Sequence, residues 1–387
     1  MRIAASGRHD SVAVPASLSA GVPAVRVSYL HGRPGPHPLQ RRLAESIGAE
    51  FEYVDFRMRW QDQDRSRLYT AASWLVCAAT LPDRSRYELF LVDNLHIGPV
   101  LMKRLFLRRD QKLVVHRASH TLYFLLTHRF SQPVERLHLW ALGNYDALVC
   151  EGEMAVDIAH RLLGDRCPPT YETFIGTPAE RQEALADVEP DLEGRRILFI
   201  GSGPGDFRLH YKGLDLMIDA VVIAAASNPA IEFDILGEWE SRIVAAMTAR
   251  VPAAIRPRIR FRGRVREIAE WLRRASLYLH CARGDAFPTA TIEAMSAGVS
   301  PLVSEWTGTK GIVAEVSDRL IAPLDAESIA ARISWYFALD AEERRELSRR
   351  SRAAARPYTE QAAATHYQAT FARIYEDLGL VRGREST

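Results

Sequence analysis

The residues best suited to chemistry are two acids, Asp285 and Glu293, which lie eight positions apart in the segment GDAFPTATIEAMSAG (284–298). This segment follows the apolar run SLYLHCARG (276–284), which predicts a β-strand. The segment therefore begins at the carboxyl end of a strand, where open α/β sheets bind ligands. A carboxylate at Glu293 can accept two hydrogen bonds from a ribose diol. The competing interpretation is a turn residue at Asp285 and a solvated helix position at Glu293.

A helix is predicted to start between the two acids, at Pro288 and Thr289, and to end at Gly298. The free backbone N–H groups of its first turn, at 289–292, would point toward the end of the preceding strand. Such groups suit a phosphate or a sugar hydroxyl. The loop and the start of this helix are therefore the predicted centre of a binding site.

The stretch GSGPGDF (201–207) carries three glycines after a predicted strand. It is similar to the Gly-rich loop of an S-adenosylmethionine methyltransferase or a dinucleotide-binding protein. In those folds the loop comes early in the chain and leads directly into a helix. Here a full α/β block precedes it, and we predict a loop that leads to Lys212 and Gly213 instead. That placement disfavours the methyltransferase, which stays an alternative.

In the N-terminal half, His116 follows an apolar strand and is predicted to face the cleft between two domains. A structural histidine is the alternative interpretation, and His120 is the second candidate for the same role. The loop HGRPGPHP (31–38) follows the first predicted strand. Gly32 or Gly35 would allow the backbone there to approach a ligand closely, whereas a plain turn is the alternative.

Two successive blocks of alternating strands and helices position these residues. In the first block, strands are predicted at 25–32, 87–94, 112–119 and 145–152, and helices at 39–47, 98–109 and 153–163. In the second, strands are predicted at 195–203, 231–238, 258–265, 276–284 and 299–306, and helices at 213–226, 241–249, 267–274 and 289–298. Apolar β-runs separated by single helices predict two doubly wound, Rossmann-like sheets.

The composition shifts suggest a division into a leader, two domains, a linker and a terminal helix. The ranges are 1–24 for the leader, 25–177 for the N-terminal domain, 178–195 for the linker, 196–356 for the C-terminal domain and 357–387 for the final helix and tail. Within 359–378, one helical face carries Tyr367, Phe371, Ile374, Tyr375 and Leu378. This helix either packs on its own domain or crosses back and ties the two domains together.

The length and composition of the chain limit the class of protein it can belong to. A chain of 387 residues suits two domains. A net charge of +2 argues against a nucleic-acid partner. The four cysteines form no CxxC pair, so we expect reduced thiols in a cytoplasmic protein. No apolar run approaches the roughly 20 residues of a membrane span, and the leader lacks the apolar core of a signal peptide.

One segment, GPVLMKRLFLRRDQK (98–112), is a basic amphipathic candidate. It is either a solvated helix face or a peripheral contact with an anionic membrane at the inner face. Such a contact would contribute about 1 kcal/mol per basic residue near the lipid.

The second block resembles the retaining glycosyltransferases of family 4, which have the GT-B fold. The D-x7-E stretch at 284–298 resembles the family's E-x7-E signature, and 197–220 resembles its strand, Lys-Gly and helix element. FDILGE (233–238) resembles its strand that ends in Gly, IRFRGRV (259–265) its base-binding turn, and SEWTGTKGIV (304–313) the following loop. The resemblance covers about 195–378 in order. In the first block it extends only in outline, through 25–36 and 114–120.

The resemblance implies roles for individual residues. Glu293 would hold the ribose, Asp285 would lie beside the donor sugar, Lys212 would bind the diphosphate, and His116 would contact sugar and diphosphate. Two departures stand out. Ser202 occupies the position of the family's usual Arg, with Arg208 as the replacement and His210 behind it, and Asp285 is one methylene shorter than the usual Glu. The implied donor-binding set comprises Gly32, Gly35, Arg208, Lys212, Gly237, Val265, Phe287, Pro288, Thr289, Ala290 and Thr291.

The implied protein is an α/β enzyme of GT-B fold, with the two domains facing each other across a cleft. It would move a hexose from a nucleoside-diphosphate sugar to an unidentified acceptor, such as a lipid-linked or cell-surface glycan, with retention. We expect no metal ligand set and no cofactor, because the nucleotide sugar is a substrate. The alternatives are a sugar-nucleotide epimerase or phosphorylase of the same fold, the methyltransferase, and a non-catalytic sugar-nucleotide-binding module.

Overall fold

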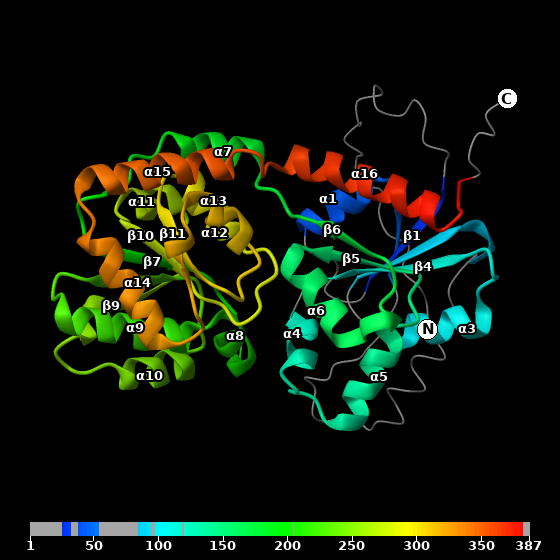
Figure 1. Ribbon diagram of the computed structural model, residues 1–387, viewed down its shortest axis with the longest axis horizontal. Helices are drawn as coiled ribbons and strands as arrows, with labels where there is room; N and C mark the ends of the chain where they lie inside the picture. The colour runs from blue at the N-terminus through cyan, green and yellow to red at the C-terminus, as the bar shows by residue number, and fades with distance from the viewer. Residues whose placement is uncertain are drawn as a thin grey trace.

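The computed structural model describes residues 25–31, 38–53, 84–93, 97–117, 120–203 and 205–381. They form two α/β domains that lie side by side, the N-terminal domain on the right of Figure 1 and the C-terminal domain on the left. Each domain is built on a six-stranded sheet of parallel strand pairs. The prediction of two Rossmann-like domains is therefore confirmed.

The N-terminal sheet has the strand order β2-β1-β3-β4-β5-β6. Its strands are β1 (Val27–His31), β2 (Glu50–Tyr53), β3 (Leu89–Asp93), β4 (Lys112–Arg117), β5 (Ala147–Glu151) and β6 (Thr170–Thr173). Its helices are α1 (Pro38–Ser46), α3 (Ile97–Phe106), α4 (His120–Leu126), α5 (Gln132–Leu142) and α6 (Glu153–Leu163), with 3-10 turns η2 (Arg84–Arg86) and η3 (Gly164–Arg166). The helices α3, α4, α5 and α6 cover one face of the sheet, and α1 covers the other.

The C-terminal sheet has the order β12-β11-β10-β7-β8-β9. Its strands are β7 (Arg196–Ile200), β8 (Glu232–Leu236), β9 (Ile259–Gly263), β10 (Leu277–His280), β11 (Ser300–Ser304) and β12 (Ile321–Ala322). The chain runs outward from β7 to β9 and then returns to β10 on the other side of β7. The adjacent strands β7 and β10 therefore form the topological switch point, where open α/β sheets bind ligands at their carboxyl ends.

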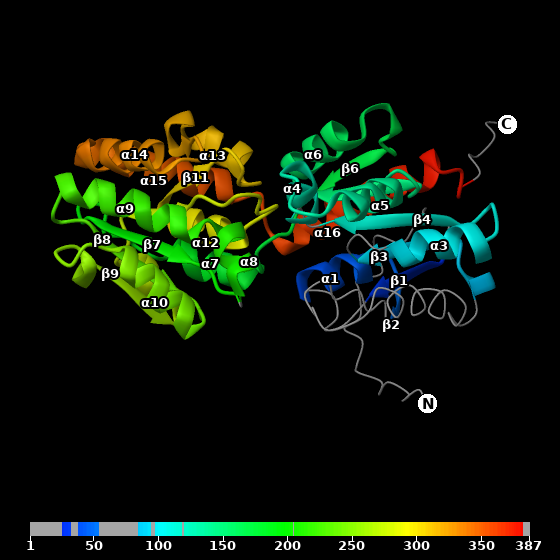
Figure 2. The same ribbon diagram turned by 90° about the horizontal axis from the view of Figure 1, so that it is seen from below.

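Helices cover both faces of this second sheet. They are α7 (Ala179–Ala186), α8 (Gly205–Lys212), α9 (Leu214–Ser227), α10 (Ser241–Arg250), α11 (Ile268–Arg273), α12 (Thr289–Ser296), α13 (Lys310–Val316), α14 (Ala326–Ala338) and α15 (Ala341–Ala355), with 3-10 turns η4 (Arg256–Arg258) and η5 (Asp318–Leu320). One core cluster includes residues of α9, α10, α13 and α14, and the opposite one includes residues of α7, α11 and α12. Viewed from below, the two domains again lie side by side (Figure 2).

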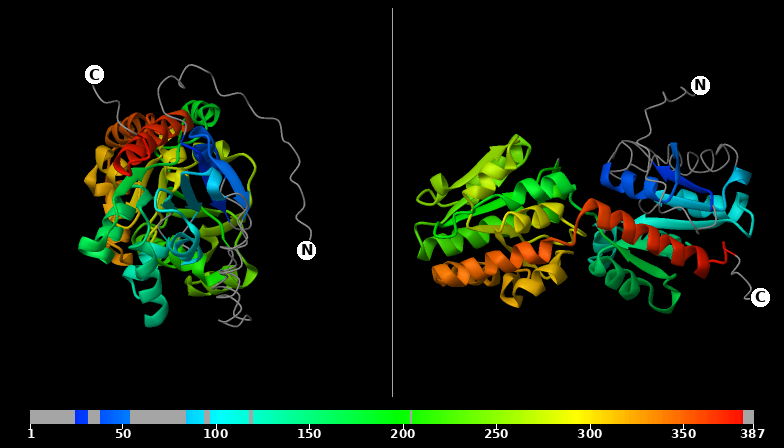
Figure 3. Two further views of the ribbon diagram at one scale, coloured as in Figure 1. Left: turned by 90° about the vertical axis from the view of Figure 1, so that its right-hand side faces the viewer. Right: turned by 90° about the horizontal axis from the view of Figure 1, so that it is seen from above.

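The final helix, α16 (Glu360–Asp377), leaves the C-terminal domain and lies along the N-terminal one (Figures 1 and 3). Its buried side chains Ala363, Tyr367, Phe371 and Ile374 belong to the core cluster of β1, β3 and α1. Of the two interpretations of this helix, the one that crosses back is confirmed. The crossing is close: a Cβ added at Gly176 would lie 2.1 Å from the carbonyl oxygen of Thr359.

The segment 178–195, predicted as a linker, differs from that expectation. Residues 179–186 form α7, and Leu185 and Val188 are buried in the C-terminal core. The polar, Pro-containing composition hid this helix because it buries only one side chain of its own, Leu185. The covalent connection between the domains is thus shorter than the sequence suggests.

The predicted loop at 201–213 is also wrong, because 205–212 form α8. Gly213, with φ +68°, separates α8 from α9, and such a conformation favours glycine. The Gly-rich stretch therefore leads directly into a helix after all. Three strands were not predicted: β2, β6 and β12 are short edge strands of their sheets, without the apolar run of a central strand.

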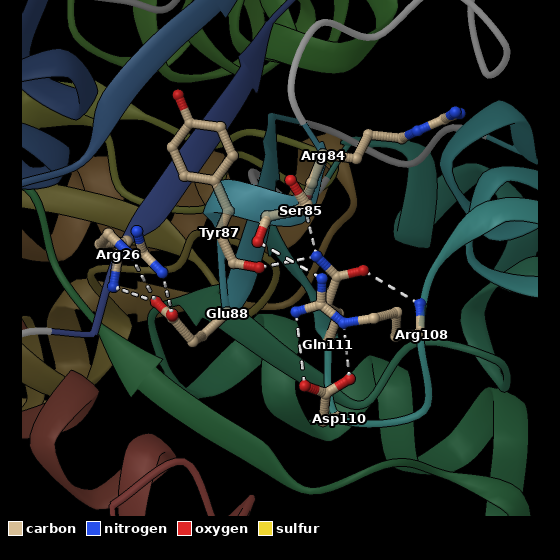
Figure 4. Close-up of polar contacts among 8 residues, drawn as sticks. All are labelled: Arg26, Arg84, Ser85, Tyr87, Glu88, Arg108, Asp110 and Gln111. Atoms are coloured by element: carbon tan, nitrogen blue, oxygen red, sulfur yellow. Dashed lines mark hydrogen bonds and ion pairs between the residues drawn. The ribbon is translucent and has the colours of Figure 1, made fainter.

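Polar contacts fasten the loops at the amino ends of the N-terminal strands (Figure 4). Glu88 accepts hydrogen bonds from the backbone N–H of Arg26 at 2.8 Å and from its guanidinium at 2.7 Å. The side-chain amide of Gln111 donates to the carbonyl oxygens of Arg84 and Tyr87 at 2.5 and 2.7 Å. This network stabilises the side of the sheet where the strands begin, opposite their carboxyl ends.

Candidate active site

Asp285 lies just beyond β10 at the switch point and is 8% exposed. Its Oδ2 accepts a hydrogen bond from the Nζ of Lys212 at the end of α8, and its Oδ1 accepts one from the hydroxyl of Tyr211 at 3.2 Å. The Nε2 of His280, the last residue of β10, lies 3.0 Å from Oδ2. These four residues, Asp285, Lys212, Tyr211 and His280, are called the Asp285 cluster below.

The Asp285 carboxylate is ionised despite its burial. Burial alone would raise its pKa, but the charge of Lys212 and the hydrogen bond from His280 hold that pKa well below its usual range. The Lys212 and Asp285 side chains are 15% and 11% exposed, so this ion pair is largely withdrawn from water. Such a pair is stable only while both charges are present, because either one alone would be buried without compensation.

Arg208 lies four residues before Lys212 on α8, and residues at this spacing share a helix face. Arg208 is exposed, and its guanidinium lies 6.0 Å from the ring centroid of Tyr211. No ion pair is found for it among the described residues. The helix thus presents one cation paired with Asp285 and a second one open to solvent.

The end of α8 packs tightly on β10. A Cβ at Gly213 would lie 2.1 Å from the carbonyl oxygen of Cys281, so only glycine allows this approach. A Cβ at Gly237 would similarly lie 2.2 Å from the carbonyl oxygen of Gly201. The close approach of these backbones brings the ends of β7, β8 and β10 together.

Glu293 lies in α12 and forms an ion pair with Arg181 of α7, with 2.5 Å between Oε1 and Nε. Burial raises the pKa of Glu293, and Arg181 partly offsets that rise. The expected ribose ligand is thus a buried carboxylate with one cation as partner. Arg181 was missed because it lies in the segment that was predicted to be a linker.

The start of α12 has the predicted form. The helix begins at Thr289 after Pro288, and no side chain caps its first N–H groups. Thr291 is fully buried, while Thr289 and Ala290 are partly exposed. Phe287 instead packs its ring against Phe174 and Tyr358 at the crossing between the domains, with centroids 6.1 and 6.0 Å away. Val265 is partly buried against the core cluster on the α7 side.

The N-terminal domain contacts α8 through α4 and the turn that follows it. Arg129 donates a hydrogen bond to the Nε2 of His210 at 2.6 Å. The rings of Phe124 and Phe207 lie 5.0 Å apart in an edge-to-face arrangement. Because α8 also carries Arg208 and Lys212, the predicted diphosphate-binding cations lie on the helix that touches the other domain.

His116 lies elsewhere than predicted. Its side chain is 1% exposed within β4, and its Nε2 lies 3.5 Å from the Oε1 of Glu151. The hydroxyl of Tyr367 on α16 lies 3.3 Å from its Nδ1, and the amide of Gln40 donates to Glu151 at 2.6 Å. We call His116, Glu151, Gln40 and Tyr367 the His116 cluster. The prediction that His116 faces the cleft is wrong, because the returning helix α16 covers it.

Gly32, Gly35 and the side chain of His120 lie outside the described residues. Within the described part of the chain, no group of three or more His, Cys, Asp or Glu side chains is arranged to hold a metal ion. No described helix combines the length and apolar character needed to cross a membrane. His280 and Tyr211 were missed as site residues, since one ends an apolar strand and the other lies in the predicted loop.

A family model and a curated relative each match part of this chain. Residues 194–338 match the family model described as glycosyl transferases group 1. A curated relative, the lipopolysaccharide core biosynthesis mannosyltransferase LpcC of Rhizobium leguminosarum bv. viciae, is 26% identical over 229 residues, or 54% of this chain. That alignment spans 60% of the length of the relative.

Solved structures share the two-domain architecture. Anabaena Alr3699/HepE in complex with UDP and glucose has a TM-score of 0.61 at 14% identity, covering 92% of this chain and 100% of that one. Sucrose-phosphate synthase from Thermosynechococcus elongatus has a TM-score of 0.63 at 15% identity, covering 92% and 100%. WaaG, a glycosyltransferase involved in lipopolysaccharide biosynthesis, has a TM-score of 0.59 at 14% identity, covering 87% and 98%. The fold is GT-B, and within it residues 194–338 match the model of glycosyl transferases group 1.

Proposed function

We propose that this protein is a glycosyltransferase that binds a nucleoside-diphosphate sugar at the switch point of its C-terminal domain. The observation that carries the proposal is the placement of Lys212 against Asp285, with Arg208 one turn earlier on α8. Transfer of a sugar from such a donor releases a diphosphate. Cations at this position would stabilise the negative charge that develops on the leaving group.

The chemistry follows from the exchange of partners at Lys212. In the structure the Lys212 ammonium contacts Asp285, and a bound diphosphate would offer it a second anion. The uncapped N–H groups at the start of α12 would take further phosphate or sugar oxygens, and Glu293 would take the ribose. We propose retention of the anomeric configuration, with the diphosphate helping to deprotonate the acceptor, because the D-x7-E segment resembles the retaining family 4.

The first test is a thermal-shift panel of UDP, GDP, ADP and CDP, because a ligand that binds the native state raises its stability. Turnover is then assayed with the sugars of the stabilising nucleotide, in the presence of excess EDTA. We expect activity without added metal, since side-chain cations take the diphosphate. A complete loss restored by Mn²⁺ or Mg²⁺ would contradict that part of the proposal. Binding of a nucleotide without turnover on any sugar would favour a non-catalytic binding module.

A membrane-linked acceptor is the second part of the proposal. Lys103 of α3 is partly buried and pairs with Asp146 at 2.9 Å, whereas Arg104 is exposed and donates to Asn144. The side chains of Leu105 and Phe106 nevertheless remain 58% and 39% exposed. Leu137 of the neighbouring helix α5 adds a further 36% exposed side chain.

We therefore propose that the end of α3 and the middle of α5 touch an anionic lipid surface on the acceptor side. The measurement is co-sedimentation with vesicles of anionic or of neutral lipid. The variants Leu105→Asp and Phe106→Asp should reduce binding to anionic vesicles. Ile223→Asp is the matched control, because Ile223 is 42% exposed on the other domain. Equal binding of all three variants would contradict the contact.

One observation favours a second candidate. The Gly-rich stretch leads straight into α8, and Glu238 follows the second strand of the C-terminal sheet, as in dinucleotide-binding folds. NAD and S-adenosylmethionine therefore belong in the same thermal-shift panel. Stabilisation by either, and by none of the nucleoside diphosphates, would favour this candidate.

A further inference from the structure

His280 is a buried titratable group of the Asp285 cluster that lies behind Asp285, and the proposed function gives it no role. It is fully buried at the end of β10. Its Nδ1 lies 3.1 Å from the hydroxyl of Tyr278, and its Nε2 lies 3.0 Å from the Oδ2 of Asp285. Its ring also contacts Phe199 on β7, with centroids 5.4 Å apart.

We propose that His280 is a positioning residue of the donor site: as a neutral imidazole it links the Tyr278 hydroxyl to Asp285 and orients the carboxylate that Lys212 contacts. This inference rests on the proposed glycosyltransferase function. His280 itself touches neither donor nor acceptor, so its effect reaches the reaction through Asp285 and Lys212.

The hydrogen bonds determine the tautomer. The Asp285 carboxylate is acceptor-only, so the Nε2 of His280 must carry the proton that is donated to it. The Nδ1 is then the acceptor for the Tyr278 hydroxyl. Burial lowers the pKa of His280, although Asp285 partly raises it, and burial raises the pKa of Tyr278 well above its usual value. Both groups therefore stay neutral at physiological pH, and the chain Tyr278–His280–Asp285 has one direction of donation.

In this arrangement Asp285 contacts Lys212 but does not depend on it alone for its position. The Oδ2 of Asp285 accepts from both His280 and Lys212, while Oδ1 accepts from Tyr211. When a diphosphate draws Lys212 forward, His280 and Tyr211 still hold the carboxylate. Asp285 then stays behind Lys212 and keeps its ammonium charged and directed toward the donor.

The test compares His280→Gln with His280→Leu. The Gln amide can donate from nearly the position of Nε2, whereas Leu cannot donate at all. We expect His280→Leu to lower kcat by about ten- to a hundredfold, the range for a lost hydrogen bond to a charged group, with a smaller change in KM for the donor. His280→Gln should recover most of this loss. Equal losses in the two variants, or a loss that follows only their thermal stability, would overturn the proposal.

A second readout is independent of turnover. The imidazole nitrogens of the full chain are observed by ¹⁵N NMR, and His280 among the 12 histidines is assigned by its absence in His280→Gln. We expect the neutral Nε2–H tautomer, and a change in that signal in Lys212→Ala and in Asp285→Asn. An Nδ1–H tautomer, or a signal indifferent to both substitutions, would overturn the proposal. If wild-type protein transfers no sugar and UDP, GDP, ADP and CDP all fail to stabilise it, the proposed function fails, while the spectrum still decides whether His280 holds Asp285.

Discussion

Each domain buries a histidine beside a carboxylate near the carboxyl end of its sheet, yet the two pairs have opposite surroundings. In the C-terminal domain, His280 holds Asp285, and beyond Asp285 lies Lys212 with a partly exposed side chain. In the N-terminal domain, His116 lies beside Glu151, and beyond it lies Tyr367 of α16, which is fully buried. The contacts of the first pair continue to a cation whose side chain is 15% exposed, and those of the second continue into a hydrophobic core.

The difference teaches that burial of a histidine and an acid does not identify a site by itself. What matters is whether the chain of contacts continues to an accessible charged group. The His116 cluster stabilises the packing of α16 against β4 and β5, because its hydrogen bonds join segments that are far apart in the sequence. The Asp285 cluster instead holds one cation ready at the switch point. Substitutions in the two clusters should therefore differ in kind, in stability for one and in kinetics for the other.

The largest effect is expected from Lys212→Ala. Loss of a charge that stabilises the departing diphosphate should lower kcat and kcat/KM together, by about 10²–10³-fold. The variant should also be less stable, since Asp285 would remain as a buried charge without its main partner. Steady-state kinetics and thermal unfolding measure the two effects. Lys112→Ala, at the amino end of β4 in the N-terminal sheet, is the matched control. Unchanged kinetics would reopen the interpretation of 201–213 as a different nucleotide-binding segment.

A somewhat smaller kinetic effect is expected from Glu293→Ala. Loss of a hydrogen-bonded contact to the ribose costs about 1.5–3 kcal/mol, so donor kcat/KM should fall by about ten- to a hundredfold while the fold remains. Nucleotide titration and circular dichroism measure binding and fold. Arg181→Ala removes only the partner of Glu293 in the donor-free protein. If Arg181→Ala reproduces the whole loss, Glu293 acts by holding α7 and not by binding the donor.

Arg208→Ala tests the exposed cation that lies one turn before Lys212 on α8. The side chain is exposed and carries no ion pair among the described residues, so stability should change by no more than about 0.5 kcal/mol. Donor kcat/KM should fall by about tenfold if the guanidinium contacts the diphosphate. Arg349→Ala, an exposed arginine of α15, serves as the control in the same assay. A silent Arg208→Ala would leave His210 as the next candidate for the second cation.

His116→Ala tests the His116 cluster. Removing the ring leaves the buried Glu151 with fewer partners, so the free energy of unfolding should fall by about 1–3 kcal/mol. The kinetics of the folded fraction should stay within about twofold of wild type. Urea unfolding and steady-state kinetics on the same preparation decide this. A large fall in kcat with unchanged stability would place His116 at the donor and remove the contrast between the clusters.

The smallest expected effect is a pH dependence of stability that is caused by protonation of His280. A base whose folded pKa lies below its unfolded value binds fewer protons in the folded state, so stability is lost as pH falls below about 6.5. The pKa of His280 is lowered in this sense by burial. Thermal unfolding of wild type should therefore decline more steeply than that of His280→Gln between about pH 6.5 and 5. His160→Gln, at an exposed position of α6, should follow the wild type. Parallel curves for all three proteins would contradict a neutral buried His280.

Most of the fold was predictable because the central strands are apolar runs bounded by helical periods. The predictions of β1, β3, β4 and β5 and of β7 to β11 are confirmed, with ends that differ by a few residues. The edge strands β2, β6 and β12 were not predicted, since short strands that are half exposed to solvent need no apolar run. The helix α8 was not predicted because two glycines precede it and a third, Gly205 with φ +76°, is its first residue.

The sequence by itself determined that Asp285, Glu293 and Lys212 would lie at the ligand-binding ends of a doubly wound sheet. The succession of strands and helices along the chain and the periodicity of their side chains are properties that the residue pattern carries. Only the tertiary structure decided which groups surround each of the two histidines. His116 and His280 both end apolar strands in the sequence, and the difference arises from α16, which crosses back to cover one sheet. That contact joins residues 251 positions apart and depends on packing that no local pattern records.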